Sequence, residues 1–145
     1  MNHRPRPPAA PWSPLAATWA TLFLGPLAGA VVTAANLRRL GRPDKALFAL
    51  ITGLASLGLL GAAWTSGVGA GDRGLLAYAL LSAGNIGLYL YLQQPDFAAW
   101  VRAHPRDLPT TPWIAASWAL IGFALTMFGL LALLTVLALA ALAGG

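Results

Sequence analysis

The residues of this chain that could do chemistry are few and isolated. The sequence contains no cysteine, which excludes thiol nucleophiles, thiolate metal sites and disulfides. His104 is the only histidine away from the terminus, and one histidine without a second ligand makes neither a metal site nor a catalytic dyad. The only acidic residues lie between the apolar stretches of the chain: Asp44, Asp72, Asp96 and Asp107. We therefore predict no catalytic residue, no metal site and no cofactor, and hence a protein that is not an enzyme.

The elements that separate these residues are apolar stretches without a single Asp, Glu, Lys, Arg or His. They cover residues 12–35, 46–65, 75–92 and 113–142. Each stretch is about long enough to cross a hydrocarbon core of roughly 30 Å as a helix. The chain is 58% hydrophobic and 9% charged, whereas a soluble domain carries about 25% charged residues. The sequence predicts an all-α fold, an integral membrane four-helix bundle that forms one domain over residues 1–145.

A short further helix is predicted in the third connection, over residues 95–104. Pro95 and Asp96 are typical of a helix N-terminus. The side chains that follow at helical spacing form one aromatic and apolar face: Phe97, Trp100, Val101 and His104. We expect this helix to lie in the membrane interface, with its charged side chains in water.

The first apolar stretch contains a small-residue motif around a proline. Gly25 and Gly29 have the GxxxG spacing that lets helices approach closely in lipid. Pro26 removes one backbone donor and should bend the helix. We expect this motif to pack against a neighbouring helix, either within the chain or in a second copy.

Asn85 is the most polar side chain within the apolar stretches. An amide in hydrocarbon needs hydrogen-bond partners, so Asn85 should face another helix and bond a serine, a threonine, a backbone carbonyl or water. The alternative is a polar cavity, and its walls would be Ser82, Asn85, Thr52 and Ser56. The sequence leaves both interpretations open.

The basic residues lie in the connections and flanks of the apolar stretches. The net charge of +5 therefore indicates membrane topology and anionic lipid rather than a nucleic-acid partner. Six of the nine basic residues lie in the connections 36–45 and 93–112, which we expect to be cytoplasmic. Both termini should then face away from the cytoplasm. Arg38 and Arg39 are candidate lipid or partner contacts.

Two segments resemble a pattern in small uncharacterised bacterial inner-membrane proteins. They are Phe23–Gly29 (FLGPLAG) and Asn36–Ala46 (NLRRLGRPDKA), and a similar order of residues follows later: Gln93, Gln94, Phe97, His104 and Trp113. The resemblance implies a bacterial cytoplasmic membrane but supplies no activity. It also implies a polar group near the cytoplasmic face, made by Asn36, Gln93, Gln94 and His104.

These features favour a non-enzymatic membrane protein that binds lipid, a membrane-protein partner or a second copy, in an accessory or scaffolding role. The main alternative is a small transporter or channel, active as a monomer or as a dimer. Because the chain contains no glutamate and no acidic residue within the apolar stretches, proton coupling through a buried carboxylate is excluded. Such a transporter would work by an uncharged pore or facilitated transport.

Overall fold

The computed structural model describes residues 10–67, 71–105, 107 and 112–143, and all the regular secondary structure among these residues is helical. The helices are α1 (Leu15–Leu24), α2 (Pro26–Arg39), α3 (Pro43–Thr65), α4 (Asp72–Ala103) and α5 (Pro112–Ala143). The last three contain the second, third and fourth apolar stretches. Two of them, α3 and α4, are long and apolar enough to cross a membrane.

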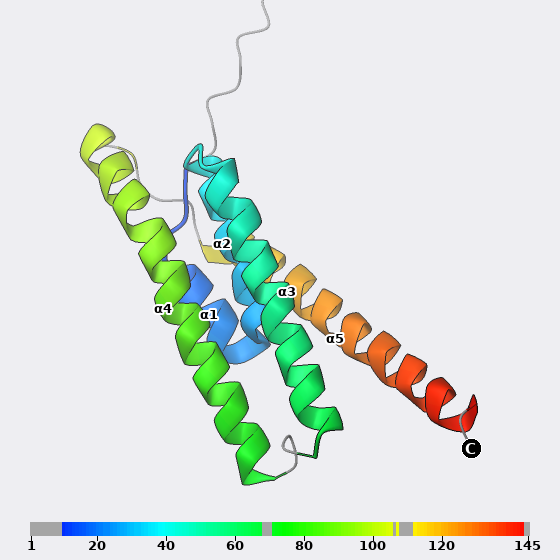
Figure 1. The fold of residues 1–145 in the computed structure, drawn as a ribbon. Coiled ribbons are helices and arrows are strands. Elements are labelled where there is room, and N and C mark those ends of the chain that lie inside the picture. Colours follow the sequence, from blue (N-terminus) through cyan, green and yellow to red (C-terminus); the bar gives the residue numbers. More distant parts are fainter. Residues whose placement is uncertain (1–9, 68–70, 106, 108–111, 144–145) are drawn as a thin grey trace, which may run out of the picture.

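The first apolar stretch is not one helix, so the predicted span 12–35 is wrong. It forms two antiparallel helices, α1 and α2, that meet at Gly25 and pack along each other (Figure 1). With 10 and 14 residues, they are about 15 Å and 21 Å long, so each reaches only part of the way across a hydrocarbon core of about 30 Å. We call this pair the hairpin.

Local chemistry accounts for the reversal. Gly25 has φ +92° and ψ 169°, a conformation that side chains with a Cβ rarely adopt. Pro26 follows as the first residue of α2, where its missing N–H costs no helical hydrogen bond. The predicted bend at Pro26 is therefore a complete change of direction, and Gly25 and Gly29 do not share one helix face.

The hairpin changes which parts of the chain lie together. Arg39 donates a hydrogen bond of 3.0 Å to the carbonyl of Ala10, so the segment before α1 lies beside the end of α2. The prediction that the chain before Trp12 and the connection 36–45 lie at opposite ends is therefore wrong. The α2–α3 turn and the C-terminal end of α4 also lie at this end, at the top of Figure 1. We call it the basic end.

The predicted interfacial helix 95–104 is also not a separate element. Helix α4 continues through Pro95 to Ala103, although a proline removes one helical hydrogen bond. Asp96, one residue later, accepts hydrogen bonds from Arg42 and Lys45 at the start of α3. These contacts hold the end of α4 against α3 instead of allowing it to turn along an interface.

Close packing between helices occurs at glycines and alanines. A Cβ on Gly29 would overlap the Thr21 hydroxyl across the hairpin, and one on Gly53 would overlap Ala30 where α3 crosses α2. A Cβ on Gly122 would lie 2.6 Å from the Cα of Ala28, so α5 also packs closely on α2. Helix α2 is thus the centre of the bundle, while α5 diverges from α3 and α4 beyond the hairpin (Figure 1).

The outer surface of these helices is strongly apolar. Large side chains more than half exposed include Phe23, Leu47, Ile51, Leu54, Leu59, Leu75, Leu80, Leu120, Phe128 and Leu131. Soluble monomers rarely expose apolar patches of more than a few hundred Å². The surface is of the kind that hydrocarbon or another protein covers.

Candidate functional site

A buried polar cluster closes the open end of the hairpin. The Oδ1 of Asn36 accepts a hydrogen bond from the backbone N–H of Trp12 at 2.7 Å, and its Nδ2 donates to the Trp12 carbonyl at 2.9 Å. The same Nδ2 donates to the Oε1 of Gln93 on α4, at 2.6 Å. Gln93 in turn donates to the hydroxyl of Thr33 and to the carbonyl of Tyr89. All of these side chains are buried, so the cluster joins the segment just before α1 to α2 and α4.

Part of the predicted polar group is present in this cluster and part is not. Asn36 and Gln93 are 1% and 0% exposed and bond each other. Gln94 is exposed on the other side of α4, and His104 is exposed beyond the end of that helix, where its Nδ1 lies 3.0 Å from the Trp100 carbonyl. The cluster has few unused donors and acceptors, so its role is structural.

The turn of the hairpin is held by Tyr89, which sequence reasoning missed. Its hydroxyl donates to the carbonyl of Pro26 at 3.1 Å, and it is 1% exposed. Its ring would lie 3.1 Å from a Cβ on Gly29, so it also packs against the middle of the hairpin. Only the spacing of four residues from Tyr89 to Gln93, which places both on one helix face, pointed toward a shared role.

The interhelical pairing predicted for Asn85 is confirmed. Its Nδ2 donates to the hydroxyl of Ser56 on α3 at 2.8 Å and to the Leu81 carbonyl at 2.7 Å. The Ser56 hydroxyl donates to the Thr52 carbonyl, while the buried Ser82 hydroxyl has no hydrogen-bond partner. Asn85 is thus bonded within the bundle and lines neither of the two pockets described below.

A group of charges fixes α3 against α4 at the basic end. The Asp96 carboxylate accepts from Arg42 at 2.9 Å and from Lys45 at 2.6 Å, and Arg42 also pairs with Asp44 at 3.3 Å. The hydrogen bond that Arg42 donates to the Asp44 carboxylate, with the nearby charge of Asp96, raises the pKa of the Arg42 guanidinium above its ordinary value. From the sequence, Asp96 was expected only to begin a helix, because its partners are more than 50 residues away along the chain.

The adjacent arginines of α2 have different surroundings. The Arg39 guanidinium lies 4.1 Å from the ring centre of Trp12, a cation–π distance, and bonds the Ala10 carbonyl. Arg38 is exposed and forms no ion pair with any residue that the structure describes. Arg38 is therefore accessible to a binding partner, whereas Arg39 is held by contacts within the protein. The sequence had suggested the same role for both arginines.

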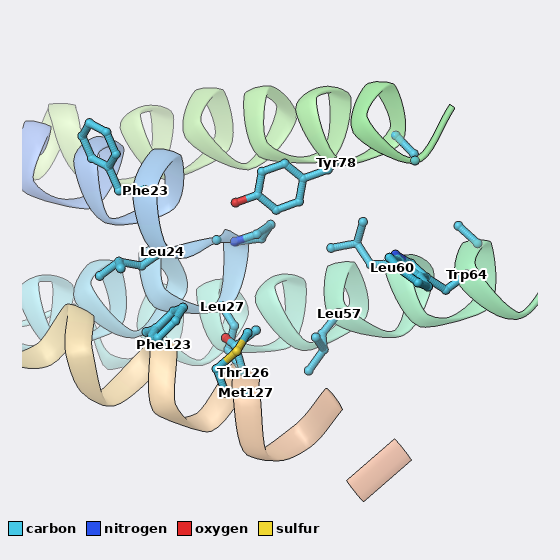
Figure 2. A pocket seen from close by; sticks show the side chains of 15 residues that line it. Phe23, Leu24, Leu27, Leu57, Leu60, Trp64, Tyr78, Phe123, Thr126 and Met127 are labelled. Carbon is cyan, nitrogen blue, oxygen red and sulfur yellow. The ribbon is translucent and has the colours of Figure 1, made fainter. Parts of the chain in front are cut away.

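An apolar pocket lies below the turn of the hairpin, with a volume of about 220 Å³. All five helices contribute to its wall, and none of the lining residues is charged. Figure 2 shows the Tyr78 ring of α4 extending toward the hairpin turn, opposite side chains from α3 and α5. The labelled lining residues are Phe23, Leu24, Leu27, Leu57, Leu60, Trp64, Tyr78, Phe123, Thr126 and Met127. We call it the hairpin pocket.

The hairpin pocket exists because the hairpin is short. Helices α3, α4 and α5 continue beyond Gly25, but α1 and α2 do not, so the space between the three long helices is not filled by protein. Its wall is mainly hydrocarbon, and its polar side chains are Trp64, Tyr78 and Thr126. The Tyr78 Oη would lie 3.6 Å from a Cβ on Gly25. Among the described residues no three His or Asp side chains are grouped to hold a metal ion.

Comparison of the chain with protein-family models, curated proteins and solved structures finds no match. The resemblance to small bacterial inner-membrane proteins therefore stays a prediction.

Proposed function

We propose that the chain is a multi-pass protein of the bacterial cytoplasmic membrane in which α3, α4 and α5 cross the bilayer and the hairpin enters and leaves on one side. The apolar outer surface and the absence of charged residues within the apolar stretches support this arrangement. Non-helical backbone such as the turn at Gly25 is tolerated within a membrane where protein covers it. Here Gly25 and Pro26 are both buried, and Tyr89 bonds the Pro26 carbonyl.

The orientation follows from the charges at the two ends of the bundle. Among the described residues, one end carries five basic side chains and the other carries Arg73 alone. The five are Arg38, Arg39, Arg42, Lys45 and Arg102. Basic residues in short connections favour the cytoplasmic side. The basic end, with the segment before α1, is then cytoplasmic, and the C-terminal end of α5 is on the opposite side.

The function that this geometry supports best is non-enzymatic binding of a lipid, and the hairpin pocket carries the proposal. In the proposed orientation the pocket lies at the depth of acyl chains in the non-cytoplasmic leaflet. Its wall is uncharged and mostly apolar, so an acyl chain fits it better than a polar solute, which would lose its hydration and gain few partners.

Photo-crosslinking tests this proposal. A phospholipid with a diazirine near the end of its acyl chain would be reconstituted with the protein, activated by light and mapped by mass spectrometry. We expect adducts on the pocket wall, including Tyr78 and Met127. Leu60→Trp, which fills the pocket, should remove them, whereas Leu59→Trp on the adjacent outward-facing residue should not. Adducts spread evenly over the outer surface and equal in both variants would refute lipid binding in the pocket.

A transporter or channel is the second candidate, and the hairpin is the observation that favours it. Re-entrant elements are found where they line a cavity in the membrane. The purified protein in liposomes would then release an uncharged solute faster than empty liposomes do. The uncharged, apolar lining of the hairpin pocket favours the lipid instead.

A further inference from the structure

A second groove lies at the basic end, on the outer side of α2 between α3 and α5. Its volume is about 320 Å³, and its lining is apolar except at one end. The lining residues are Val31, Ala34, Ala35, Arg38, Arg39, Leu50 and Trp118. The small side chains of Ala34 and Ala35 form the floor of the groove, while Leu50 and Trp118 form its sides. We call it the arginine groove.

Only part of the charge near the mouth of this groove is balanced by carboxylates among the described residues. Arg42 and Lys45 are paired with Asp44 and Asp96, so the charges of these two side chains are neutralised within the protein. Arg38 is different: it is exposed, it lines the groove, and it has no ion pair within the described part of the chain. A guanidinium matches a phosphate oxygen pair in geometry as well as charge.

The apolar groove and its charged end match the two parts of one ligand. Val31 and Arg38 are seven residues apart on α2, so they lie on the same face, about 10 Å apart along the helix. This is the order in which a phospholipid places its acyl chain and its phosphate relative to the membrane surface. A water-soluble anion would use only the arginine end and gain nothing from the apolar floor.

We propose that the arginine groove binds an anionic phospholipid, with the phosphate of its headgroup on the Arg38 guanidinium and one acyl chain along Val31, Ala35 and Trp118. Arg39, fixed against the Trp12 ring, adds positive charge at the same mouth. This inference rests on the proposed membrane orientation. It does not depend on the occupant of the hairpin pocket, because the two sites share no lining residue.

Native mass spectrometry of the protein, released from nanodiscs that contain equal amounts of phosphatidylglycerol and phosphatidylcholine, tests the proposal. The wild-type protein should retain phosphatidylglycerol in preference to phosphatidylcholine. Arg38→Gln should reduce that preference about fivefold, since one cation near an anionic surface contributes ~1 kcal/mol. Arg73→Gln, which removes the same charge at the opposite end, should leave it unchanged. Inorganic phosphate at the lipid concentration should not compete.

A second variant tests the apolar half of the site. Val31→Phe fills the groove without changing charge, so it should reduce retention of phosphatidylglycerol while Arg38 stays in place. Circular dichroism establishes that each variant is folded. Equal retention of the two lipids by the wild type, or an equal effect of Arg38→Gln and Arg73→Gln, would overturn the inference. Loss of acyl-chain crosslinks in Leu60→Trp concerns the hairpin pocket alone, so the two proposals fail separately.

Discussion

The side chain of Asn36 bonds both backbone groups of Trp12, at 2.7 and 2.9 Å, although 24 residues separate them. Trp12 lies just before α1 and Asn36 lies in the last turns of α2, so this pair closes the hairpin at the end opposite to Gly25. Without it, the N–H and C=O of Trp12 would be buried without partners. The Asn36 amide therefore holds the end of α2 beside the segment that precedes α1.

Replacing Asn36 should open this end of the hairpin. Asn36→Leu removes three hydrogen bonds and leaves the Trp12 backbone unpaired. At the ~0.6 kcal/mol average for hydrogen bonds within membrane proteins, the expected loss of stability is about 2 kcal/mol. Thermal unfolding in mild detergent measures it. Gln94→Leu, at an exposed amide beside Gln93, is the matched control and should shift the melting temperature little.

Much of this fold could be predicted from the sequence. Stretches free of charge predicted helices that correspond to α3, α4 and α5, and the polarity of Asn85 predicted its interhelical bond. The hairpin was missed because a glycine and a proline in an apolar run are compatible with both a bend and a reversal. The choice depends on contacts far apart in the sequence, such as Asn36 with Trp12 and Tyr89 with Pro26. The local hydropathy of the sequence does not reveal such contacts.

A second prediction concerns the close contact inside the hairpin. Gly29→Ala places a Cβ onto the Thr21 hydroxyl. Thr21 is β-branched and fixed by its bond to the Ala17 carbonyl, so α1 and α2 must move apart. We expect a loss of about 1–3 kcal/mol, the range for overpacked cores. Gly84→Ala, where a Cβ meets no atom within 4 Å, should be neutral or stabilising in the same unfolding assay. Equal shifts for the two variants would show that the hairpin is not packed in this way.

The turn of the hairpin should depend on one hydroxyl. Tyr89→Phe removes the bond to the Pro26 carbonyl and leaves that carbonyl without this donor. The expected cost is about 1 kcal/mol. Tyr91→Phe removes an exposed hydroxyl from the same helix and should not change the melting temperature. A melting temperature that falls in Tyr91→Phe but not in Tyr89→Phe would contradict the contact described for Tyr89.

The ion pairs of Asp96 should make a measurable but modest contribution at the basic end. Asp96→Asn leaves Arg42 and Lys45 without their shared carboxylate, and partly exposed pairs contribute about 1 kcal/mol or less. The difference between wild type and Asp96→Asn should shrink as salt is added, because salt screens exposed charges. Asp72→Asn at the opposite end serves as the control. A difference that salt leaves unchanged would mean that packing, not charge, holds the end of α4.

The central claim is that the first apolar stretch returns to its own side, and labelling of single cysteines tests it most directly. The chain contains no cysteine, so His3→Cys, Asp107→Cys and Ser66→Cys each introduce one thiol. In intact bacterial cells, a membrane-impermeant maleimide should label Ser66→Cys, whereas His3→Cys and Asp107→Cys should react only after the membrane is permeabilised. Labelling of His3→Cys from outside, together with Ser66→Cys, would mean that residues 12–35 cross the membrane, and it would contradict the hairpin.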